Sequence, residues 1–122
     1  MTHLFIRVKF ARGGILGPGK AELLERIAET GSIRKAAAAM KMSYRRAWLL
    51  VQAMEEMFAA PVIARATGGR RGGGASLTPL GRTLIRRFRA IETYAARAAA
   101  EELHALEKLA AAGNRRSRPG RG

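Results

Sequence analysis

The chain has 122 residues, the length of one domain. Of these, 48% are apolar, which is enough to form a buried core and excludes a chain that is disordered throughout. The formal net charge is +14 and the isoelectric point is about 11.7, so a polyanionic partner is expected: DNA, RNA or an anionic membrane.

Three features that are absent from the sequence indicate the cellular compartment. It contains no cysteine, so it forms no disulfide. The N-terminal apolar run carries charges within it, which argues against a signal peptide. No apolar run approaches the roughly 20 residues that span a bilayer. We expect a soluble, cytoplasmic protein.

The first predicted element is a hairpin. Residues His3 to Phe10 alternate between the two faces of a half-buried strand. Gly13 and Gly14 are turn candidates, and Ile15-Leu16 is a candidate return strand, ended by the glycine-proline-glycine stretch at 17–19. The expected inner face holds Leu4, Ile6, Val8 and Phe10.

Three helices are predicted next. The first covers residues 20–30 and ends at Gly31, where a positive φ is favoured. The second follows Ser32, a good N-cap, and ends near Met40, and the third covers 43–58 with Ser43 as its cap. A helix, a short connection and a second helix form a helix-turn-helix. The apolar stripes are Leu23, Leu24, Ile27 and Ala28; Ile33, Ala36, Ala37 and Met40; and Ala47, Leu50, Val51, Met54 and Phe58.

A second hairpin and a long helix complete the chain. Strands are expected at 62–67 and 75–78, around the glycine-rich stretch 68–74. Thr78 caps a helix that has Pro79 at its first position and continues to about residue 112. A helix this long carries a surplus apolar stripe, which predicts a partner helix from a second copy of the chain. Residues 113–122 are expected to form a disordered basic tail.

The candidate contact residues lie at the start of the third helix. Ser43, Tyr44, Arg45 and Arg46 occupy its first turn, where free N–H groups and the helix dipole favour phosphate. Arginine can bind guanine bidentately in the major groove, and Tyr44 or Ser43 can reach a phosphate. The alternative is a solvated basic turn.

Arg70 and Arg71 lie in the glycine-rich hairpin tip and are candidate contacts to the DNA backbone or minor groove. A phosphate-cradling nucleotide loop would need a following helix, whereas a strand follows here. A merely flexible loop remains the alternative. Arg34 and Lys35 are further candidates for backbone contact, and Trp48 is expected to pack against the hairpin or the first helix.

Catalytic and metal-ligating patterns are absent from the sequence. His3 and His104 stand alone at opposite ends, and the glutamate pairs are adjacent in sequence, so their members point in different directions on a helix. No catalytic triad and no metal-ligand spacing occurs. We expect neither an enzyme nor a cofactor.

From Leu16 to about Ile91 the chain resembles the N-terminal DNA-binding domain of ModE-type molybdate-responsive transcriptional regulators, itself similar to that of LysR-type regulators. The resemblance is carried by GSI followed by AA, MSYRRAW, RATGG with GGGA, and LTPLG. It implies a mainly α fold with small β-hairpins: a winged helix-turn-helix over residues 1–112, with a dimerisation helix at about 79–112. It also implies a homodimer that binds double-stranded DNA at palindromic operators, with the hairpin at 68–74 as the wing.

Full-length members of that family bind molybdate in a C-terminal domain, where this sequence has an arginine-rich stretch. DNA binding is therefore expected to transfer, whereas molybdate sensing is not. Three alternatives remain open: constitutive action, response through a separate molybdate-sensing partner, and regulation of something other than molybdate uptake. The alternative to a sequence-specific regulator is a non-specific nucleic-acid-binding protein, either chromosome-associated or RNA-binding, which the high charge also allows.

Overall fold

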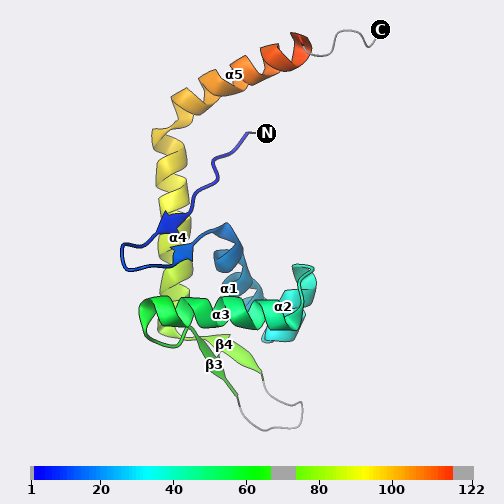
Figure 1. Ribbon diagram of the computed structural model, residues 1–122, viewed down its shortest axis with the longest axis vertical. Coiled ribbons are helices and arrows are strands. Elements are labelled where there is room, and N and C mark those ends of the chain that lie inside the picture. Colours follow the sequence, from blue (N-terminus) through cyan, green and yellow to red (C-terminus); the bar gives the residue numbers. More distant parts are fainter. Residues whose placement is uncertain (1, 67–73, 117–122) are drawn as a thin grey trace. The chain divides into compact units, whose positions relative to one another are not determined.

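The computed structural model describes residues 2–66 and 74–116. Within this part of the chain, five helices and two antiparallel hairpins follow in the order β1, β2, α1, α2, α3, β3, β4, α4, α5 (Figure 1). The chain divides into two compact units: Ile6–Arg89, and the residues up to Phe5 together with those from Ala90 onward. The predicted helix-turn-helix and its flanking hairpins all lie in the first unit. The mainly α fold with small hairpins is thus confirmed.

The N-terminal hairpin is shorter than predicted. Strand β1 is Val8–Lys9 and pairs antiparallel with β2, Ile15–Leu16. The turn glycines are confirmed, since Gly13 and Gly14 have φ values of 111° and 96°. The predicted strand from His3 was wrong in length, because α1 begins two residues after β2 and leaves β1 only a two-residue partner. The expected alternation persists, with exposed side chains at the odd positions.

Helix α1 (Pro18–Thr30) starts two residues before the predicted range, with Pro18 at its first position. The lysine side chain at its start, Lys20, donates to the carbonyl oxygen of Ile15 at 2.7 Å and so ties the hairpin to the helix. Burial and the nearby Arg7 guanidinium lower the pKa of Lys20. Ala28 is exposed, contrary to its assignment to the apolar stripe, because it lies at the edge of the buried face.

Helices α2 (Ile33–Ala39) and α3 (Tyr44–Phe58) are joined by a tight turn. Lys41 has a φ of 57° in this turn. Its N–H donates to Ala38 O at 3.1 Å, and the next N–H, of Met42, donates to Ala37 O at 3.0 Å. This pair of bonds is the Schellman motif, which ends a helix through one left-handed residue. It fixes the direction in which α3 starts.

The second hairpin consists of β3 (Ile63–Arg65) and β4 (Ala75–Leu77), paired antiparallel with Ile63 opposite Leu77. It projects from the first unit beside α3 (Figure 1). Both strands lie within the predicted ranges. The carboxylate of Glu55 in α3 accepts from the N–H of Val62 at 2.9 Å and, at a longer 3.4 Å, from that of Ile63. One helical side chain thus holds the start of the hairpin.

Helix α4 (Pro79–Ala98) begins after Thr78, whose hydroxyl accepts from the N–H of Gly81 at 3.1 Å as predicted for a cap. Helix α5 is Ala100–Arg116. The predicted continuous helix is therefore interrupted at Ala99, where the apolar stripe changes phase, and helical structure extends four residues beyond the predicted boundary at 112. Residues 117–122 of the predicted tail lie outside the described residues.

The core of the first unit is built from the predicted stripes of the three helices, supplemented by the hairpins and the start of α4. Helix α1 packs against α2 and α3, and α2 packs against α3. The ion pair between Arg89 and Glu25, at 2.8 Å, links α4 to α1. The largest fully buried side chains are Leu23, Leu24, Ile27, Val51, Met54, Val62 and Phe88.

Candidate nucleic-acid interface

The first turn of α3 presents the predicted contact residues to solvent. Ser43, Tyr44, Arg45 and Arg46 are all exposed. The Ser43 hydroxyl accepts from the N–H of Arg46 at 3.0 Å, which confirms it as the N-cap. The buried face of the helix starts at the following residue, Ala47. The arginines are thus carried by a helix whose opposite side is fixed in the core.

Tyr44 is oriented by the preceding helix. The guanidinium carbon of Arg34, on α2, lies 4.5 Å from the centroid of the Tyr44 ring, within the range of a cation–π interaction. Sequence reasoning had treated Arg34 as a separate candidate for backbone contact and missed this pairing. The two residues are ten positions apart, so the one indication of this contact in the sequence was the short connection between the two helices. The pairing places a cation and a phenol side by side at the helix-turn-helix.

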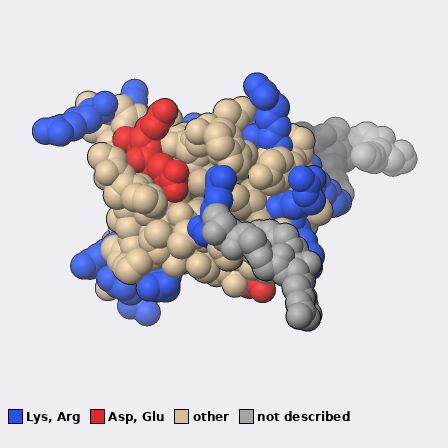
Figure 2. All heavy atoms as spheres, turned by 90° about the horizontal axis from the view of Figure 1, so that it is seen from below, with Lys and Arg blue, Asp and Glu red and all other residues tan. Residues whose placement is uncertain are grey.

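The stretch between Glu29 and Glu92 is strongly basic, with Glu55 and Glu56 as its only acids. Between Glu29 and Glu55 there are five lysine or arginine residues and no acid, and between Glu56 and Glu92 there are seven arginines and no acid. Figure 2, which views the end where β3 and β4 project, shows several groups of Lys and Arg side chains and far fewer acidic ones. A surface of this kind attracts phosphate over the range of the Debye length, about 8 Å at physiological salt.

The hairpin meets α3 through an aromatic contact. The guanidinium carbon of Arg65, on β3, lies 5.7 Å from the centroid of the Trp48 ring, which is half-buried. Of the two packing partners expected for Trp48, the hairpin and the first helix, the hairpin is the one that this contact shows. Arg65 is a basic hairpin residue that the sequence did not single out. The two predicted hairpin contacts, Arg70 and Arg71, lie outside the described residues.

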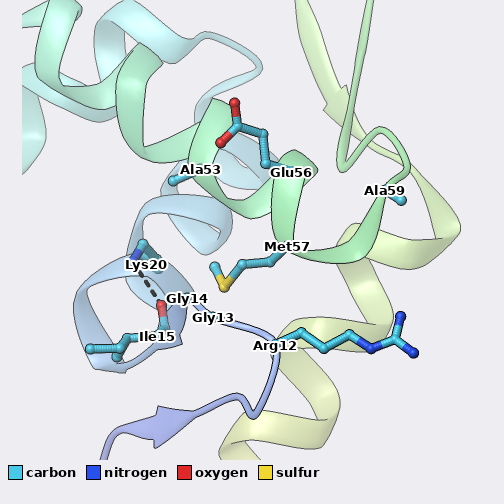
Figure 3. Close-up of a pocket in the computed structure, with 9 residues that line it drawn as sticks. All are labelled: Arg12, Gly13, Gly14, Ile15, Lys20, Ala53, Glu56, Met57 and Ala59. Atoms are coloured by element: carbon cyan, nitrogen blue, oxygen red, sulfur yellow. Dashed lines mark hydrogen bonds between the residues drawn. The ribbon is translucent and has the colours of Figure 1, made fainter.

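Two surface hollows flank α3. One, of about 320 Å³, lies at its first turns and is lined by Ser43, Arg45, Arg46, Leu49 and Leu50. The other, of about 480 Å³, lies between the N-terminal hairpin, α1 and the end of α3 (Figure 3). In it Lys20 is engaged with Ile15, while Arg12 and Glu56 point apart, so its charged groups do not converge on one point.

The described residues contain no cluster of His, Cys, Asp or Glu that could hold a metal ion. In the same part of the chain, no helix has the length and apolarity required to cross a membrane. The first turn of α3 offers exposed guanidinium groups, a hydroxyl and helix N–H groups, all of which suit phosphates and base edges.

Relatives with curated descriptions match the first two thirds to three quarters of the chain. It is 49% identical over 80 residues to the molybdenum-pterin-binding protein MopB of Rhodobacter capsulatus, covering 66% of this chain and 30% of that protein. It is 39% identical over 80 residues to the molybdenum transport protein ModE of Azotobacter vinelandii, with the same coverage. The chain thus spans about 30% of the length of these relatives.

Solved structures show the same fold. A complex of CbnR_DBD with DNA superposes with a TM-score of 0.57 at 22% identity, covering 72% of this chain and 95% of that one. LysG of Corynebacterium glutamicum with bound effector Arg gives a TM-score of 0.55 at 22% identity, covering 76% of this chain and 30% of that one.

The family model described as bacterial regulatory helix-turn-helix protein, lysR family, matches residues 19–82, which include α1, α2, α3 and the second hairpin. This match covers 64 of the 122 residues, more than half of the chain. The chain belongs to the LysR family of bacterial regulatory helix-turn-helix proteins.

Proposed function

We propose that the chain is a sequence-specific transcriptional regulator that binds double-stranded DNA in the cytoplasm, as a homodimer on palindromic operators. The observation that carries this proposal is the exposed, capped first turn of α3, with Arg45 and Arg46 on a helix-turn-helix that belongs to a regulatory family. In such domains the second helix of the motif enters the major groove and its N-terminal residues contact base edges.

Different residues in the first turn of α3 contact phosphates and bases. Arg45 lies on the side of the helix opposite the buried Ala47 and Val51, so its guanidinium is aimed at a base edge, where it can bind guanine O6 and N7. Tyr44, held by Arg34, and the Ser43 hydroxyl lie at the helix start and contact phosphate. Arg46 flanks this face and contacts phosphate or a neighbouring base.

The hairpin β3–β4 is the wing, and Arg70 and Arg71 hold the flanking DNA backbone. Supporting this role, the hairpin is attached to α3 at two points, through Glu55 at its start and through the Arg65–Trp48 contact. A wing anchored in this way keeps a fixed position relative to the recognition helix. Its contacts raise affinity without reading bases.

A second copy of the chain pairs with the first through the end of α4 and α5. This region exposes four large apolar side chains: Ile91, Tyr94, Leu106 and Leu109, with 42%, 66%, 61% and 67% of their surface accessible. Leucines exposed to this extent on one helix indicate a partner. Replacing Leu106 and Leu109 by glutamate should convert a dimer into a monomer in light scattering; unchanged mass would contradict this interface.

The decisive experiment is selection of bound duplexes from a random DNA library with the purified chain. We expect enrichment of a two-fold symmetric sequence whose half-site centres lie about 34–36 Å apart. Against the selected duplex, random duplex should compete about 10³-fold more weakly, or worse. If nothing is enriched and random duplex or RNA competes equally, the chain is a non-specific nucleic-acid-binding protein and the regulator proposal fails.

The molybdenum-related names belong to relatives about three times longer than the matched region. We assign no oxyanion site to the described residues and propose that these residues bind DNA without sensing molybdate themselves; a separate molybdate-sensing partner is one route to a response. Adding molybdate to the purified chain should then leave its affinity for the selected duplex unchanged. A change of several-fold with molybdate alone would contradict this proposal.

A further inference from the structure

Leu49 is an exposed apolar side chain beside the basic first turn of α3. It has 47% of its surface exposed, whereas the other leucine of α3, Leu50, is partly buried against the core. A single exposed leucine needs no explanation by itself. Leu49, however, lines the 320 Å³ hollow at the start of α3 together with Arg45 and Arg46, and no acidic residue occurs between Thr30 and Met54.

The position of Leu49 on the helix places it next to Arg45. The two residues are four positions apart, so they lie on the same face, separated by about 6 Å along the axis at 1.5 Å per residue. The core residues Ala47, Val51 and Met54 occupy the opposite face. A partner surface that Arg45 contacts therefore also lies next to Leu49.

Resting on the proposed function, we propose that Leu49 is a specificity-determining residue that contacts the C5-methyl group of a thymine. In the major groove, an A·T pair displays the C5-methyl group of thymine, which a G·C pair lacks, and apolar side chains recognise this methyl by contact. The separation of about 6 Å corresponds to one or two steps of roughly 3.4 Å along the DNA. The thymine therefore lies one or two base pairs from the guanine bound by Arg45.

The test compares thymine with deoxyuridine, which differs only in lacking that methyl group. In the selected duplex, each thymine of a half-site is replaced in turn by deoxyuridine, and affinity is measured for the wild-type chain and for Leu49→Ala. We expect one replacement, near the Arg45 guanine, to weaken wild-type binding about fourfold, the effect of exposing one buried methyl-sized group. The same replacement should have no effect on Leu49→Ala.

Phe5→Ala is the control, because it truncates an exposed apolar side chain outside both the helix-turn-helix and the proposed dimer contact. It should keep the fourfold ratio between thymine and deoxyuridine whatever it does to total affinity. The proposal is overturned if no replacement weakens the wild type, or if the penalty persists in Leu49→Ala. Either result leaves sequence-specific binding intact, whereas a selection that enriches no sequence removes the proposed function itself.

Discussion

Glu55 is the side chain through which α3 holds the start of the wing. Its carboxylate accepts from the N–H of Val62 at 2.9 Å, and Val62 is fully buried. In Glu55→Ala this N–H loses its charged acceptor. Hydrogen bonds to charged groups contribute about 1.5–3 kcal/mol, and an orphaned buried donor costs a similar amount. The second bond, at 3.4 Å, adds little.

We therefore expect Glu55→Ala to lower the free energy of unfolding by about 2–3 kcal/mol, and the melting temperature by on the order of 10 °C. Urea and thermal unfolding followed by circular dichroism measure both. Glu56→Ala is the control, because Glu56 is exposed and lies in the same turn, so charge and helix-end effects are matched. If the free energies of unfolding of the two variants agree within about 0.5 kcal/mol, which is the usual effect of a surface substitution, Glu55 does not anchor the wing.

Three further outcomes are expected. Arg45→Ala should relax base preference at one position of each half-site by about 1–3 kcal/mol, measured by binding to single-base operator variants; unchanged preference would refute the assignment. Replacing both Arg70 and Arg71 by alanine should weaken binding to all duplexes and reduce the slope of log affinity against log salt by about 1.8, or 0.9 for each phosphate contact. Gly81→Ala should destabilise the fold by about 1–3 kcal/mol, since the added Cβ would lie 2.5 Å from a backbone carbonyl oxygen; Gly113→Ala, with open space around it, is the control in urea unfolding.

Short-range signals predicted the fold of the first unit well. The caps Ser32, Ser43 and Thr78 each accept the N–H bond expected of them, and Gly31 has the positive φ expected after α1. These features depend on residues within one turn of each other, so the sequence alone displays them. The wing strands were also predictable, because glycine-rich residues and Pro61 mark their limits.

Features set by distant partners were harder to predict. The length of β1 is limited by the number of residues in β2, which ends before α1 begins. The alternation in His3–Phe10 carries no information about the length of β2. The interruption at Ala99 occurs among alanines and Arg97, which all favour helix. Likewise, the contact of Arg34 with Tyr44 follows from the turn at Lys41, whose left-handed residue is a lysine rather than the usual glycine.

Methylation interference on the selected duplex shows whether α3 enters the major groove, because methyl groups on guanine N7 block the major groove and those on adenine N3 block the minor groove. We expect N7 methylation of guanines at two positions, related by a two-fold axis and about 10 base pairs apart, to prevent binding, and we expect Arg45→Ala to lose this sensitivity. Interference confined to adenine N3, or at no symmetric pair of guanines, would contradict the entry of α3 into the major groove.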